Sequence, residues 1–208
     1  MSNALSDTSE TLRALLEAEM LADVGPLGVA NFFGGANTEV SIATPAEMIR
    51  QKKQGLSVWL YRVARDDTRL NDPPVVRPLA GGGVEMVPPP LPLRLHYLMT
   101  PLAPKAPDTE QKILGRVLRT FHSRPIVSGA ALTGDLIGTD AEISVRMEPM
   151  TLDEITRVWE ALEGSYQLAV SYEATLALIT SAALPLRPGI VESVRRDAAL
   201  ILKREAVR

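Results

Sequence analysis

Side chains able to carry out chemistry are scarce in this chain, which has two histidines and no cysteine. The lack of cysteine excludes disulfides and thiolate metal sites. His96 falls within a predicted strand, and His122 ends a predicted helix, where an imidazolium would stabilise the helix C-terminus. No H-x-x-x-H, H-E-x-x-H or D-x-D-x-D-G spacing occurs. Because metal sites need several convergent ligands, neither histidine is predicted to bind a metal or a cofactor.

Other motif-like patterns have simple local explanations. Gly129-x-x-x-x-Gly134 has the glycine spacing of a phosphate loop, but Asp135 follows where a lysine is needed, so the segment is predicted to be a turn. Asp153-Glu154 falls in the first turn of a predicted helix, where acids complement the dipole. Asp66-Asp67 follows a strand and is interpreted as a pair of solvated turn acids. With no G-x-S-x-G elbow either, no catalytic residue is predicted and the chain is not expected to be an enzyme.

Aromatic side chains leave two further interpretations open. Trp59 and Tyr61 share one face of a predicted strand, as a sugar-stacking platform requires, but Val63 continues that face and favours core packing. A small-ligand or carbohydrate-binding module using Trp59, Tyr61 and Tyr97 is therefore the alternative function, and exposed aromatics in a cleft would favour it. A hydrolase is the third interpretation, and it needs a pocket joining a histidine, an acid and a nucleophile.

Charge is unevenly distributed along the 208 residues. The net charge of −3 argues against a general nucleic-acid binder. Residues 187–208 carry six basic and three acidic side chains, so this tail is basic and the remainder is acidic. Such a tail is typical of a partner-binding appendage. The start of the chain lacks a signal-peptide pattern, and no apolar run reaches the ~18 residues of a membrane span, so we expect a cytoplasmic location.

Hydrophobic periodicity predicts three helices and five strands. The first helix carries Leu12 to Met20, with Asp7 or Ser9 as its cap and Gly25-Pro26 as its stop. The second begins at Asp108 and has apolar residues at core spacing at 113, 114, 117, 118 and 121. The third begins at the capping box Thr151-x-x-Glu154, with apolar positions at 152, 155, 158, 159 and 162. Strands are predicted at residues 39–43, 56–65, 91–99, 140–148 and 166–179.

The segment between the second and third strands, residues 66–90, is long for a loop and has a pattern of its own. Val75-Val76-Arg77 and Val84 to Val87 flank Gly81-Gly82-Gly83. This pattern predicts a protruding β-hairpin with a glycine turn.

Together these elements predict an α+β fold. We expect a mixed or mostly antiparallel sheet of four to five strands with about three packed helices in residues 1–184. Residues 185–208 are predicted to form a C-terminal extension. Its apolar positions at 190, 191, 194, 198 and 201 fit an amphipathic helix, although residues 198–203 also fit a strand.

Several segments, in this order and spacing, resemble one known family. They are Asn3-Ala4-Leu5 with its helix, residues 56–63 with Asn71, residues 90–101, the helix 110–121, residues 149–154 with Trp159, and residues 166–173. The family forms the cap, or tail-terminator, proteins of extracellular, phage-tail-like contractile injection systems. The resemblance implies a tail-terminator-like fold and a hexameric ring that terminates the tube and sheath and becomes part of the particle. It implies no catalytic motif.

Contact residues are predicted in two places. Hairpin 75–87 is expected to reach a neighbouring subunit or the tube, and the basic tail is expected to dock on sheath or tube. The predicted partners are thus the chain itself and the tube and sheath subunits, without nucleic acid or a membrane span. The predicted partner-binding residues are Val75, Val76, Arg77, Val84, Met86, Arg187, Arg195, Arg196, Lys203 and Arg204.

Overall fold

A computed structural model describes residues 3–26, 28–79 and 83–179. The chain divides into two compact units. The larger contains Met1–Asp72 and Pro90–Ser181, and the described part of the smaller is residues 73–79 and 83–89. The boundary predicted at residue 184 and the five basic tail residues, Arg187, Arg195, Arg196, Lys203 and Arg204, lie outside the described residues.

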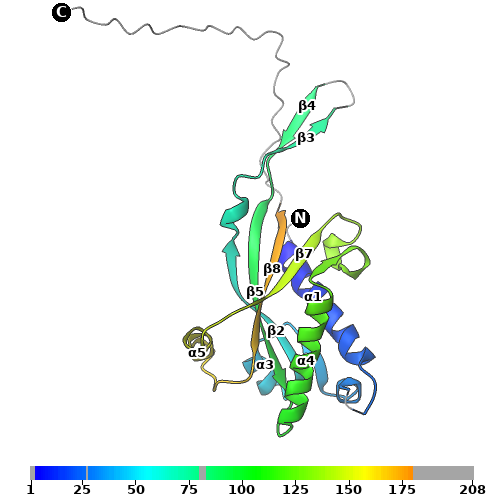
Figure 1. Ribbon diagram of the computed structural model, residues 1–208, viewed down its shortest axis with the longest axis vertical. Coiled ribbons are helices and arrows are strands. Elements are labelled where there is room, and N and C mark those ends of the chain that lie inside the picture. Colours follow the sequence, from blue (N-terminus) through cyan, green and yellow to red (C-terminus); the bar gives the residue numbers. More distant parts are fainter. Residues whose placement is uncertain (1–2, 27, 80–82, 180–208) are drawn as a thin grey trace, which may run out of the picture. The chain divides into compact units, whose positions relative to one another are not determined.

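The larger unit is built on one six-stranded sheet in the order β1-β2-β5-β8-β7-β6 (Figure 1). β1 pairs with β2 in parallel and every other pair is antiparallel. This is the mixed, mostly antiparallel sheet that was predicted, but it has six strands instead of four to five. The additional one is a short strand at the edge, at residues 126–128. The strands are β1 (Thr38–Ser41), β2 (Gln54–Arg65), β5 (Leu91–Leu102), β6 (Ile126–Ser128), β7 (Glu142–Glu148) and β8 (Val170–Ile179).

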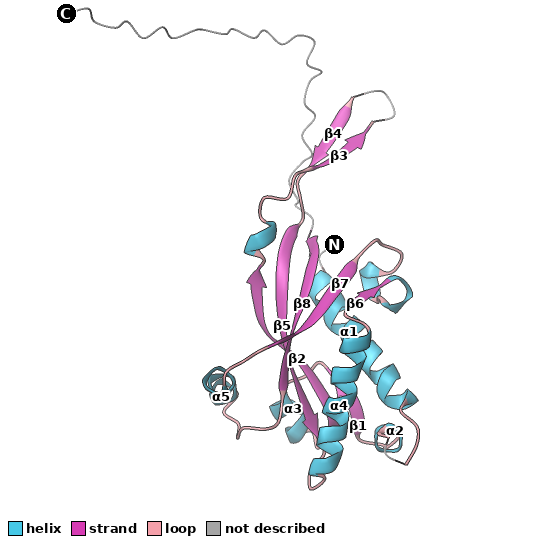
Figure 2. Cartoon of the chain, in the orientation of Figure 1, coloured by secondary structure: helices cyan, strands magenta, loops and turns pink. Residues whose placement is uncertain are grey.

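Two long helices cover one face of this sheet, α1 (Ala4–Ala22) and α4 (Pro107–Ser123) (Figure 2). Alternate β5 residues meet them, so Leu95, Tyr97 and Met99 lie in the main core with Leu16 of α1 and Val117 of α4. Burying such a continuous apolar face accounts for most of the stability expected of the unit.

The start of α1 was predicted too late. The helix begins at Ala4, after the N-cap Asn3. Asp7 does not cap it, because its carboxylate accepts a hydrogen bond from the Asp135 backbone N–H at 3.1 Å. Asp7 instead ties the helix to the turn at Gly129–Gly134, whose two glycines have positive φ. The turn interpretation of this segment is confirmed.

The opposite face of the sheet carries α5 (Leu152–Ala161). Both hydrogen bonds of the predicted capping box form between Thr151 and Glu154. Ile155 and Trp159 pack with Leu98 in a second, smaller core cluster. Leu152, the first of the predicted apolar positions of this helix, is 72% exposed.

Several short elements were not predicted. They include α2 (Ala30–Phe33) and α3 (Pro45–Arg50), and α3 starts with a second capping box, Thr44 with Glu47. The last strand begins at Val170 instead of Tyr166, and Tyr166 and Leu168 are exposed. Three 3-10 turns, at 67–69, 129–131 and 134–136, complete the unit.

The smaller unit contains the predicted hairpin. β3 (Val75–Pro78) pairs antiparallel with β4 (Val84–Val87), placing Val75 opposite Val87 and Val76 opposite Met86. Gly83 has φ of 93°, a conformation that favours glycine. Among the described residues, no helix is both long and apolar enough to cross a membrane.

Candidate functional site

The described partner-binding candidates all lie on the hairpin. Val75, Val76 and Val84 are 51%, 56% and 40% exposed, Arg77 is exposed, and Met86 is half-buried. Successive strand residues point to opposite faces, so Val75 and Val76 make the hairpin apolar on both faces. An isolated two-stranded ribbon is only marginally stable in water, so an apolar ribbon of this kind gains from contact with a partner.

The aromatics proposed for ligand stacking are used in packing. Tyr97 is fully buried in the main core, and its hydroxyl lies 2.9 Å from Ser9 Oγ on α1. Trp59 and Tyr61 pack partly buried against the cluster around Trp159. This arrangement favours the core interpretation over a sugar-stacking platform.

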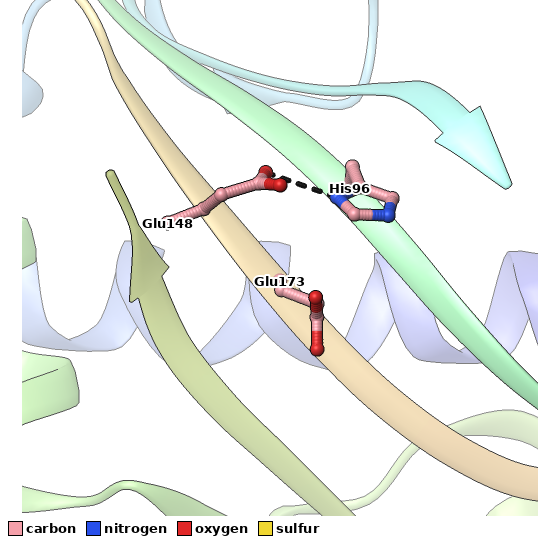
Figure 3. A group of neighbouring side chains, drawn as sticks. All are labelled: His96, Glu148 and Glu173. Atoms are coloured by element: carbon pink, nitrogen blue, oxygen red, sulfur yellow. Dashed lines mark hydrogen bonds and ion pairs between the residues drawn. The ribbon is translucent and has the colours of Figure 1, made fainter. Parts of the chain in front are cut away.

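His96 belongs to a polar network that the sequence did not reveal. Its Nδ1 lies 2.9 Å from Glu148 Oε2 (Figure 3). The same oxygen accepts hydrogen bonds from Ser171 Oγ at 2.9 Å and Tyr61 Oη at 3.2 Å. Burial pushes the pKa of Glu148 up, but the hydrogen bonds from His96, Ser171 and Tyr61 outweigh burial and hold it below its ordinary value. Glu148 is therefore ionised at neutral pH, and His96 Nδ1 is the donor.

A line of charged side chains crosses the sheet beside this network. The register places Arg62 next to His96, His96 next to Glu173, and Glu173 next to Arg146, on four neighbouring strands. Glu173 is buried, and its Oε1 lies 2.7 Å from the Arg146 guanidinium. His96, Glu148 and Glu173 line an open depression of about 710 Å³, together with Arg62, Ala64, Arg65, Asp67 and Arg94.

Asp66 was wrongly interpreted as a solvated turn acid. It is only 4% exposed, and its Oδ1 accepts hydrogen bonds from Thr68 and from the Arg94 guanidinium, the nearest at 2.7 Å. The Thr68 hydroxyl and Arg94 lower the pKa of Asp66. Asp67, by contrast, is exposed as expected.

In this network both the serine hydroxyl and the histidine donate to one carboxylate. The hydrolase interpretation instead requires a histidine that accepts the proton of a nucleophile. Ser171 donates to Glu148, and His96 donates to the same oxygen. A nucleophile–base pair requires the hydroxyl to donate to the imidazole, and among the described residues the structure gives no such bond. His122 is exposed at the end of α4, away from this group, as its predicted role at the helix terminus requires.

An apolar groove lies on the α4 face of the sheet. It has a volume of about 580 Å³ and is lined by Leu118, Phe121, His122, Pro125, Val145, Arg146, Met147 and Tyr172. Leu118 was predicted at core spacing, and Met147 lies on the apolar face of the strand predicted at 140–148, but they are 38% and 56% exposed. Their periodicity is correct, but both side chains stay at the surface beside the groove, whereas Ile143 and Val145, which precede Met147 on the same face of β7, are buried.

Comparison with known proteins identifies the family. Residues 7–193 match the Pvc16 N-terminal domain. The chain belongs to this family. The match spans most of the residues on which the resemblance to cap proteins was based, and it confirms that resemblance. No curated protein matches the sequence.

Two solved structures share the fold of this Pvc16 N-terminal domain. One is the PVC sheath/tube terminator of an extracellular contractile injection system in its extended state, with a TM-score of 0.57 and 16% identity over 94% of this chain and 65% of that chain. The other is the tube-terminating cap of the anti-feeding prophage, with a TM-score of 0.56 and 17% identity over 89% of this chain and 59% of that chain. The chain thus spans less than two thirds of either, and the likeness confirms the predicted α+β, tail-terminator-like fold.

Proposed function

We propose that this chain is a structural cap protein, which forms a homo-hexameric ring that terminates the tube and sheath of a contractile injection system. The observation that carries the proposal is the fold, shared over 94% of this chain with a sheath/tube terminator. The carboxylate-centred arrangement of His96, Glu148 and Ser171 agrees with a structural, non-enzymatic role. Under this proposal the protein assembles in the cytoplasm and then becomes part of the particle.

A closed ring of identical subunits needs two different, complementary surfaces on each subunit. The apolar hairpin offers one surface, and we assign it to a neighbouring subunit or the tube. The groove at Leu118 and Met147 offers a second apolar surface, and apolar surface that is grouped in this way is typical of an interface. A neighbouring copy is its proposed occupant, because a heterologous ring contact has to pair unlike patches. The basic tail then remains for docking on sheath or tube.

The ring is tested by light scattering of the full chain, for which a hexamer is expected and a stable monomer would contradict the proposal. Replacing residues 75–87 by a short Gly-Ser linker should abolish the ring while leaving the larger unit folded. Val76→Glu should weaken the ring in the same way. Ile137→Glu is the matched control, because Ile137 is 67% exposed on the larger unit and outside both surfaces. If the variant without the hairpin still forms a hexamer, the hairpin is not part of the interface between subunits.

The tail is tested separately by truncation before Pro185. The truncated chain should stay folded but fail to cap particles. Electron micrographs of particle ends provide the measurement. If the truncated protein still decorates those ends, the basic tail is not the dock.

A further inference from the structure

His96, Glu148 and Glu173 form a group with the composition of a metal site. They come from β5, β7 and β8, and one ligand atom from each lies within 4.8 Å of the other two (Figure 3). We propose that these three side chains bind a divalent transition-metal ion of the zinc class. The proposal goes beyond the cap function and does not depend on it.

The distances suit such an ion after a small adjustment. Zinc bonds to nitrogen and oxygen ligands are about 2.0–2.2 Å long, so two ligands of one ion lie up to roughly 4 Å apart. Closing from 4.8 Å therefore needs side-chain shifts of under about 1 Å. The three residues sit on adjacent paired strands, and rigid elements of this kind hold ligands in place. The open depression that they line gives an ion a route from solvent.

A second observation at Glu173 points to a ligand. Glu173 is 5% exposed, and its Oε1 is fully buried. The Arg146 guanidinium approaches that oxygen at 2.7 Å as an ion pair, but from a side chain that is 65% exposed. A buried carboxylate needs a counter-charge, and a bound metal ion would supply it in place of the exposed Arg146 side chain.

The surrounding groups favour the zinc class over calcium or magnesium. Imidazole is a preferred ligand of zinc and its neighbours in the transition series, whereas calcium and magnesium take oxygen ligands. Tyr61 and Ser171 donate hydrogen bonds to Glu148, and outer contacts of this kind orient a ligating carboxylate.

Calorimetric titration of Zn²⁺ into the chelator-treated full chain tests the site. We expect one ion per chain, with binding at least roughly tenfold weaker in His96→Gln and in Glu173→Gln. Arg146→Gln should bind more tightly, because the competing cation is gone. His122→Gln is the control, since this exposed histidine would report adventitious surface binding.

Co²⁺ provides a second measurement, since its visible absorption is weak in water and becomes intense when protein ligands hold the ion in a four-coordinate site. Melting temperatures of each variant without metal show whether it is folded, so a loss of binding can be separated from a loss of structure. Absence of saturable Zn²⁺ binding by the native chain would overturn the proposal. So would equal affinity in the native chain, His96→Gln and Glu173→Gln, or a loss of binding confined to His122→Gln.

Discussion

The hydroxyl of Tyr97 gives the sharpest stability test of the fold. Tyr97 is fully buried on β5, and its hydroxyl donates to Ser9 Oγ on α1, whose own hydrogen is donated to the Leu5 carbonyl. In Tyr97→Phe, Ser9 keeps its bond to Leu5 and loses only an incoming donor. The variant should therefore lose about 1 kcal/mol at neutral pH, the usual worth of one such hydrogen bond.

At high pH the sign of this difference should reverse. Burial raises the pKa of Tyr97 from 10.0 to about 12. Above pH 10 the unfolded chain loses the Tyr97 proton more readily than the folded chain, which favours unfolding. The contribution of the neutral Tyr97 to folding is therefore fully present below pH 10 and is lost as the pH rises through the folded-state value of about 12. Two pKa units correspond to about 2.7 kcal/mol, and about half of this is lost near pH 11. The phenylalanine variant should thus match the native chain near pH 11 and exceed it above.

Urea unfolding followed by tryptophan fluorescence, at several pH values from about 8 to 11.5, measures both free energies. Tyr166→Phe is the matched control, because Tyr166 is 53% exposed and its loss of a hydroxyl should change nothing. Titration of the lysines and arginines is common to both proteins and cancels in the comparison. A difference between native and Tyr97→Phe chains that stays constant with pH would refute the burial argument.

Three further substitutions test other features. Leu16→Ala removes a fully buried α1 side chain from the main core and should cost about 3–4 kcal/mol, seen as a lower urea midpoint with an unchanged slope. Thr151→Ala breaks the capping box of α5 and should cost about 1 kcal/mol by thermal melting, with a larger loss contradicting a purely local role. In Glu148→Gln, the native chain should be more stable at neutral pH, because the native carboxylate has a lowered pKa. That advantage should vanish as the pH falls through and below the ordinary value of 4.5, and an advantage that persists in acid would contradict the assignment.

The features that the sequence predicted are those with local causes. Thr151 and Glu154 are three residues apart, and their reciprocal bonds depend on little else. The strand predicted at 91–99 sends alternate side chains, Leu95, Tyr97 and Met99, into the main core, because a strand has a period of two. The hairpin followed from two short apolar runs around glycines. In each case a few neighbouring residues contain all the information.

The features that were missed depend on partners far along the chain. Asp66 has the bonds to Thr68 expected of a turn acid, but its burial comes with Arg94, which lies 28 residues away. His96 meets Glu148 only because β8 pairs with both β5 and β7. Met147 has the correct period for a core residue, but it is 56% exposed, while Val145 on the same face of β7 is buried. Periodicity assigns a face, but only the packed structure decides whether that face is covered.

The segments that carry the family resemblance are mostly core segments, and this limits what the resemblance can report. Val58, Tyr97 and Tyr172 all lie in the main core. A pattern of core residues specifies a fold, which is why that fold persists at 16–17% identity. Contacts between subunits instead involve exposed side chains, such as Val76 of the hairpin and Met147 of the groove. Exposed positions are free to differ between relatives whenever both partners of a contact change together, so the ring contacts of this chain have to be established on its own surface residues.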